Sequence, residues 1–287
     1  MLHDTDPNDI FDRTRRRALR ERAGRRSDAF LWPLIADELS DRLVDVTRTF
    51  TEALVIGPMA TYLPQVLRER GMSVTTAALS ISEKRSPDMM VVEEDRLPFQ
   101  PASFDLVMVA GTLDSVNDLP GALVQIRRVL RPDGLFLGHM FGAGSLTQLK
   151  GAMLDSHKNS AAPHIHPQID LRSAADLLGR AGFAMPVADC DTTTVRYSAW
   201  HLLIDDLRDM GTGNALAGQR SYLGRQFLHA LRLNWSSRAE NDGKVPEQFV
   251  HLYMSGWAPS DEQPQPAKRG SATVSLASIL GTDKSGD

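Results

Sequence analysis

The chain has 287 residues, enough for one or two domains, and its 42% hydrophobic and 24% charged residues are ordinary for a globular protein. This composition excludes a chain that is disordered throughout, and the net charge of −4 excludes a generally basic nucleic-acid binder. The single cysteine, Cys190, excludes a disulfide framework and a multi-cysteine metal site.

No apolar run approaches the roughly 18–20 residues that a membrane span needs. The opening residues, MLHDTDPNDIFD, are acidic and contain no apolar core, which argues against a secretory signal or a transit peptide. The sequence therefore predicts no membrane span and a cytoplasmic location.

Residues 13–26, RTRRRALRERAGRR, hold eight arginines against one glutamate and form a basic arm. Two interpretations stay open: a solvated basic helix, or a docking arm for an acidic partner, nucleic acid or anionic lipid. Residues 29–45 follow with apolar side chains at helical spacing. We therefore predict a helical N-terminal extension over residues 1–50.

From residue 53 onward, short apolar runs alternate with helical patterns. Strands are predicted at residues 53–57, 73–79, 89–94, 104–111 and 135–141, and helices at 61–71 and 119–134. Alternation of this kind indicates an α/β fold with a doubly wound, mostly parallel sheet and helices on both faces.

The second half keeps both kinds of element. Helices are predicted at residues 173–183, 199–211 and 222–235, and strands at 187–197 and 248–258. Residues 259–287 are rich in proline, glycine and serine and predict a flexible C-terminal tail. The main domain is therefore expected over residues 51–258, with helical insertions in its second half.

The stretch EEDRLPFQPASFDLVMVAGTLDSVNDLPGALVQIRRVLRPDGLFLGHMFG (93–142) resembles the second half of a class I S-adenosylmethionine-dependent methyltransferase domain. The segments IFDRTRRRALRERA (10–23), HMFGAGSLTQL (139–149), PHIHP (163–167) and PAKRGSATVSL (266–276) narrow the resemblance to the methyltransferase-like assembly factors of respiratory complex I. That family includes proteins that hydroxylate an arginine of a complex I subunit, and methyltransferases of the biotin pathway are related. The resemblance implies a seven-stranded Rossmann-like sheet, S-adenosylmethionine as cofactor, and a protein partner in place of nucleic acid.

In the superfamily the first strand ends in an acid and a loop of the form D-x-G-x-G-x-G, whose glycines let the backbone approach the cofactor. Here the segment reads LVIGPMAT. Val55 replaces the acid, Gly57 matches the first glycine, and Met59 and Thr61 replace the others. Pro58 also lacks a backbone N–H, so the sequence predicts a degenerate cofactor loop.

The second strand normally ends in an acid that binds the cofactor ribose, but this chain offers Ala78 or Leu79 there and no acid before Glu83. The third acid survives: the resemblance assigns Glu93, with its neighbour Glu94, to the adenine side of the cofactor. The predicted cofactor-binding residues are thus Gly57, Glu93 and Glu94. The plainer interpretation of Glu93 is an exposed carboxylate at the end of a strand.

Other polar residues have weaker claims, and no catalytic residue is assigned. His164 and His166 form an H-x-H pair that suits a metal, but no third ligand is placed, so no metal site is predicted. Asp114 follows the strand at 104–111, at the sheet edge where ligands bind, and could pair with a guanidinium. A helix cap is the alternative for Asp114, and Asn117 and Asp118 are expected to be caps.

Three functions follow from these observations. The first is a methyltransferase-like complex I assembly factor acting on a protein partner, with S-adenosylmethionine or molecular oxygen chemistry implied by the resemblance. The second is a non-catalytic binding protein that keeps only the fold and the partner surface. The third is a methyltransferase of a small or carrier-bound substrate.

Overall fold

A computed structural model describes residues 8–25, 29–58, 62–80, 89–156, 164–218, 223–261 and 263. Within these ranges one sheet of seven strands has the order β3-β2-β1-β4-β5-β7-β6. The strands are β1 (Glu52–Ile56), β2 (Ser73–Ala78), β3 (Met90–Val91), β4 (Phe104–Ala110), β5 (Leu130–Phe141), β6 (Ala184–Tyr197) and β7 (Val245–Trp257). Strands β1 to β5 are parallel, whereas β7 is antiparallel to both β5 and β6. The predicted doubly wound, mostly parallel sheet is confirmed.

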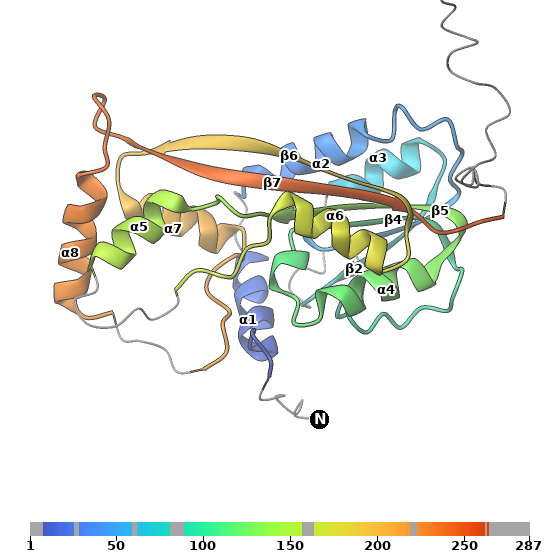
Figure 1. The fold of residues 1–287 in the computed structure, drawn as a ribbon, viewed down its shortest axis with the longest axis horizontal. Helices are drawn as coiled ribbons and strands as arrows, with labels where there is room; N and C mark the ends of the chain where they lie inside the picture. Colours follow the sequence, from blue (N-terminus) through green and yellow to red (C-terminus); the bar gives the residue numbers. More distant parts are fainter. Residues whose placement is uncertain are drawn as a thin grey trace, which may run out of the picture.

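Helices cover both faces of this sheet (Figure 1). They are α1 (Arg13–Ala23), α2 (Leu31–Asp41), α3 (Leu63–Glu69), α4 (Leu119–Val129), α5 (Thr147–Ser156), α6 (Leu171–Arg180), α7 (Trp200–Asp209) and α8 (Arg225–Ser236), with a short 3₁₀ turn, η3 (Leu113–Ser115). In Figure 1, α5, α7 and α8 gather at the left end of the molecule, and α1 lies below the sheet. Both α1 and α2 precede the first strand, as the helical pattern of the N-terminal region predicts.

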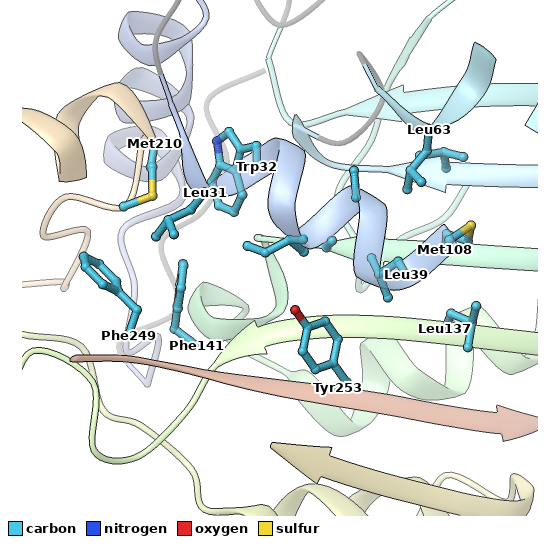
Figure 2. Close-up of a cluster of buried hydrophobic side chains, with 14 of the residues drawn as sticks. Leu31, Trp32, Leu39, Leu63, Met108, Leu137, Phe141, Met210, Phe249 and Tyr253 are labelled. Atoms are coloured by element: carbon cyan, nitrogen blue, oxygen red, sulfur yellow. The ribbon is translucent and has the colours of Figure 1, made fainter. Parts of the chain in front are cut away.

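The parallel strands are buried on both faces, so alternate side chains enter two separate apolar layers. On β4, Leu106 and Met108 pack with α2 and α3, whereas Val107 and Val109 pack with α4 and α6. The first layer extends beyond the sheet into α5, α7 and α8, where the side chain of Trp235 is almost fully buried. Figure 2 shows this layer where α2 lies over the strands.

Several elements differ from the sequence prediction. Strand β5 begins at Leu130, because the Pro-Asp-Gly segment is accommodated within the strand by a register shift against β4, with Asp133 at φ 59°. Strand β3 is only two residues long, and α5 was not predicted as a helix. No helix of the described residues is long and apolar enough to cross a membrane. The predicted tail lies almost wholly outside the described residues.

Candidate functional site

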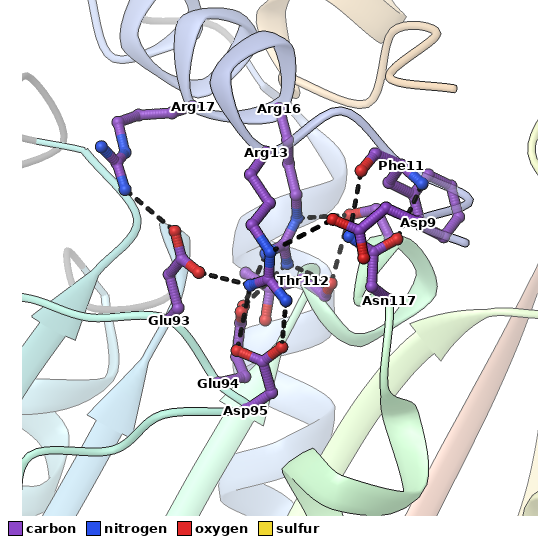
Figure 3. A network of polar contacts seen from close by, with 11 residues as sticks. Asp9, Phe11, Arg13, Arg16, Arg17, Glu93, Glu94, Asp95, Thr112 and Asn117 are labelled. Atoms are coloured by element: carbon purple, nitrogen blue, oxygen red, sulfur yellow. Dashed lines mark hydrogen bonds and ion pairs between the residues drawn. The ribbon is translucent and has the colours of Figure 1, made fainter. Parts of the chain in front are cut away.

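The basic helix α1 binds the acidic segment that follows β3, and Arg16 makes the most deeply buried of these contacts (Figure 3). Its two terminal nitrogens each donate to a carboxylate oxygen of Glu94 at 2.9 Å. The same guanidinium donates to the Ser115 hydroxyl at 2.9 Å and to the Thr112 carbonyl at 2.7 Å. Burial lowers the pKa of Arg16, but the Glu94 carboxylate outweighs burial and raises the pKa above its ordinary value.

Two further arginines of α1 bind the neighbouring acids. Arg13 forms a bidentate contact with Asp95, at 2.6 and 3.1 Å, and also donates to Glu93. Asp9 lies 3.7 Å from the Arg13 Nε, and Arg17 donates to the other Glu93 oxygen at 2.9 Å. All three acids of the segment therefore have arginine partners from α1.

Local contacts fix where α1 begins. Asp12 caps the helix, because its carboxylate accepts from the backbone N–H of Arg15 at 2.9 Å. Asn117 holds the preceding residue in place: its side-chain oxygen accepts from the Phe11 N–H at 2.7 Å, and its amide donates to the Phe11 carbonyl at 3.0 Å. The predicted helix-cap role of Asn117 is therefore wrong, since its amide bridges to the N-terminal segment instead.

Arg20 continues the same face of α1 one turn further along. Its guanidinium donates to the Gly111 carbonyl at the end of β4 and to the Met210 carbonyl at 2.9 Å, and lies over the Trp32 ring at 5.8 Å. Arg16 and Arg20 are only 7% and 2% exposed. The solvated-helix interpretation of the arm is wrong for these residues, because their charge is used within the fold.

The loop after β1 shows why Gly57 is a glycine. Its φ is +104°, and an added Cβ would lie 2.3 Å from the Ala110 carbonyl oxygen. Close approach to β4 is therefore sufficient to require glycine, whether or not a cofactor binds. Val55, which replaces the superfamily's acid, is fully buried between the strand and the helices. Met59 and Thr61 lie outside the described residues.

The remaining cofactor positions do not fit S-adenosylmethionine in the way the superfamily holds it. Ala78 and Leu79 are buried apolar side chains and provide no carboxylate for a ribose. Glu93 and Glu94 are already bound by arginines of α1. A cofactor role for Gly57, Glu93 and Glu94 remains a prediction, and it requires these ion pairs to open. Glu83 lies outside the described residues.

A separate cavity of about 470 Å³ lies on the other side of α1, and Gly57, Glu93 and Glu94 do not line it. Its apolar wall comes mainly from α5, α7 and the ends of β5 and β7. Its charged and polar lining side chains are Arg15, Arg22, Asp114, Ser145, His164, His166, Gln168, Arg208, Thr212 and Asn214. An apolar pocket with a few convergent polar groups is the usual form of a binding site.

Asp114 is the acid in this pocket. One of its carboxylate oxygens is buried and has no hydrogen-bond partner among the described residues. It does not cap a helix, whereas Asp118 does, accepting from the Gly121 N–H at 2.8 Å. The cap prediction is therefore confirmed for Asp118 and wrong for Asp114. Burial lowers the pKa of His166, and the nearby Asp114 charge opposes this effect.

The two histidines of the H-x-H pair both line the pocket but contact different neighbours. The Nε2 atom of His166 accepts from the Ala215 N–H at 2.9 Å, and its ring packs edge-on against Phe11 at 4.9 Å. His164 packs against Phe227 at 6.0 Å. Among the described residues, no three side chains of the metal-ligating types lie close enough to hold a metal ion.

Sequence reasoning missed a buried histidine pair between β5 and β7. His139 Nε2 lies 3.0 Å from His251 Nδ1, and His251 Nε2 lies 3.1 Å from the Thr193 hydroxyl. Burial lowers the pKa of both rings, that of His251 to about 4. Single histidines on two distant strands carry no local signal, so only the strand register reveals the pair.

Comparison with known proteins agrees with this architecture. Residues 56–138 match the methyltransferase domain family. The solved structure of BH2331 from Bacillus halodurans C-125 superposes with a TM-score of 0.52 over 78% of this chain and 99% of that one, at 12% identity, which shows the fold alone.

Two curated relatives cover most of the sequence. The mitochondrial arginine-hydroxylase NDUFAF5 of Danio rerio is 35% identical over 94% of this chain and 89% of its own length. A malonyl-[acyl-carrier protein] O-methyltransferase of Coxiella burnetii is 28% identical over 86% and 87%. The chain therefore belongs to the NDUFAF5 family, within the class I methyltransferase superfamily.

Proposed function

We propose that this protein is a complex I assembly factor that acts on an arginine of a protein partner. The observation that carries the proposal is the pocket of about 470 Å³ beside the carboxyl edge of β4, lined by the Asp114 carboxylate, one oxygen of which is buried without a hydrogen-bond partner among the described residues. An arginine guanidinium donates in the fork geometry that a carboxylate accepts. Membership of a family whose curated relatives are named arginine-hydroxylases supports the same substrate.

The contacts at the expected cofactor positions argue against ordinary methyl transfer. The acids that would hold S-adenosylmethionine bind α1, and the ribose acid is replaced by apolar side chains. We therefore assign no chemical step to that cofactor. The alternative is a protein that binds its partner without modifying it. These contacts favour that alternative, because the pocket and the expected cofactor positions lie on different sides of α1, whereas group transfer needs substrate and cofactor side by side.

A carrier-bound substrate is the weaker candidate. The Coxiella burnetii relative bears the name of a malonyl-[acyl-carrier protein] methyltransferase, but methyl transfer needs the cofactor contacts that the described residues lack. We propose a reducing compartment such as the cytoplasm, where an exposed thiol like that of Cys190 stays reduced. The NDUFAF5 relatives are named mitochondrial.

Gene deletion and complementation test the proposal. Complex I from the deletion strain should be incompletely assembled, and an arginine-bearing subunit should lack a modification that mass spectrometry finds in the parent strain. Added oxygen on that arginine indicates hydroxylation, and an added methyl group indicates methyl transfer. Normal assembly and unchanged arginines in the deletion strain would exclude the proposed function. Restored assembly with an unmodified arginine would favour the non-catalytic alternative.

A further inference from the structure

Helix α1 presents two different faces. Arg13, Arg16 and Arg17 point to the acids beyond β3 (Figure 3). Arg20 follows one turn later on the same face and donates to the Gly111 carbonyl. The residues that line the pocket, Arg15 and Arg22, belong to the opposite face. Positions three and four apart lie on the same side of a helix. The arginines on the acid-binding side therefore all face the fold and bind partners within it. Of the pocket-facing arginines, Arg15 donates to the Leu216 carbonyl and lies 3.8 Å from Asp12, which leaves Arg22 to serve a ligand.

The charged groups of the pocket lie at different depths. Asp114 lines the pocket with a half-buried side chain, and one of its oxygens is shielded from solvent, so a donor that enters the cavity meets the other oxygen. Arg22 is exposed, and the Arg208 side chain is 59% exposed, so both guanidiniums reach solvent at the rim. A ligand that satisfies the pocket therefore needs a cation at its inner end and negative charge around it.

The rim arginines keep donors for such a ligand. Arg22 donates through Nε to the Ala18 carbonyl of its own helix, and no carboxylate of the described residues pairs with it. Among the described residues, Arg208 pairs with Asp205 alone, three residues earlier at 2.9 Å, a contact on the exposed surface of α7. Exposed pairs of this kind contribute little and exchange readily.

We propose that the pocket recognises an arginine flanked by acidic residues in an extended segment of the partner protein. The inserted guanidinium pairs with Asp114, and aspartate or glutamate side chains next to it in the partner pair with Arg22 and Arg208. This inference rests on the proposed function and adds the sequence context of the target. It also explains how a pocket that carries three arginines can accept a cation, because the flanking acids neutralise the rim.

Synthetic peptides test the inference with the full chain. Three fluorescein-labelled peptides are compared by anisotropy: a central arginine flanked by glutamates, the same arginine flanked by lysines, and the glutamate-flanked peptide with citrulline in place of arginine. The glutamate-flanked arginine peptide should bind best. Citrulline, which is neutral, should bind at least about tenfold more weakly, because hydrogen bonds between charged groups are the stronger ones.

Variants separate the inner site from the rim. Asp114→Asn should weaken the arginine peptide about tenfold or more while leaving the citrulline peptide nearly unchanged. Arg208→Glu and Arg22→Glu should each weaken the glutamate-flanked peptide about threefold and strengthen the lysine-flanked one, and the effect should shrink at high salt. Arg25→Glu is the matched control, because Arg25 is exposed near the end of α1, pairs with Glu21 and does not line the pocket.

Thermal denaturation of each variant verifies folding. Equal binding of the lysine-flanked peptide, no effect of Asp114→Asn, or no binding of any peptide overturns the inference. The two proposals fail differently. Peptide binding as described, with no arginine modified in cells, removes the proposed reaction only. A modified arginine in cells, with none of these peptides bound, removes the acidic-context inference only.

Discussion

The buried ion pair between Arg16 and Glu94 is the contact whose removal should cost the most stability. Glu94 is fully buried and the Arg16 side chain is 8% exposed, so neither charge can be solvated by water if its partner is lost. Replacing Glu94 by Gln keeps the shape of the side chain but leaves the guanidinium without its counterion. Breaking one partner of a buried pair costs about 3–5 kcal/mol.

This variant should sit at the lower end of that range, at about 3 kcal/mol, because the Ser115 and Thr112 oxygens still accept from Arg16. Such a loss is a large part of the roughly 5–15 kcal/mol that stabilises a typical protein. Urea denaturation followed by circular dichroism measures it. Arg16→Met combined with Glu94→Met should be much less damaging than Glu94→Gln alone, since an apolar pair leaves no buried charge.

An exposed pair on the same helix provides the control. Glu21→Gln removes the partner of Arg25, whose side chain is 71% exposed, and should change stability by less than about 0.5 kcal/mol. A loss of stability below about 1 kcal/mol for Glu94→Gln, or a double variant as unstable as the single one, would refute the conclusion that Arg16 and Glu94 form a buried ion pair.

Three further outcomes are expected. His139 and His251 have pKa values below that of an unfolded histidine, so the unfolded chain binds more protons between about pH 6.5 and 4. Urea denaturation should therefore show stability falling as pH falls, by up to about 1.4 kcal/mol per pH unit for each ring. A flat profile over that range would contradict the burial of the pair. Gly57→Ala should lower the stability by about 2–4 kcal/mol in the same assay, since its Cβ would meet the Ala110 carbonyl at positive φ. Gly179→Ala, with open space around it on α6, should be neutral or slightly stabilising. Equal effects at the two positions would count against the close approach of Gly57 to β4. No DNA affinity tighter than about 10 μM is expected at physiological salt by anisotropy, because Arg13, Arg16, Arg17 and Arg20 of the arm bind partners within the fold and non-specific binding is typically about 10⁻⁴–10⁻⁶ M; submicromolar binding would reopen the nucleic-acid interpretation.

Most of the fold could be predicted because its strands carry a local signal. The continuous apolar run of β4 indicates a strand buried on both faces, and the Asp118 cap with Pro120 marks the start of α4. Helix α5 was missed because its apolar residues, Leu149 and Ala152 among them, do not form a strong periodic stripe. Its position depends on packing against α8, which no local pattern reveals.

The sequence predicts some residues of the candidate site but not the contacts between them. The resemblance predicts that Glu93 and Glu94 belong to the cofactor region, and the sequence shows that arginines crowd residues 13–26. It does not show that these two groups, about 80 residues apart, bind each other. Complementary charge in the two segments was the available signal. Pairing them required the register of α1 against the sheet edge, which depends on Asn117 and other tertiary contacts.

Hydrogen exchange at α1 measures directly whether this helix is held against the acids at residues 93–95 by its arginines. The amides of Arg13–Ala23 should exchange slowly, as expected for a helix that is docked on the fold. We also expect any affinity for S-adenosylmethionine to be weaker than about 1 mM, so about 1 mM of it should leave exchange at α1, at residues 93–95 and at residues 111–112 unchanged. Rapid exchange throughout α1 would contradict the docking of the helix, and protection of those segments by the cofactor would contradict the limit on its affinity.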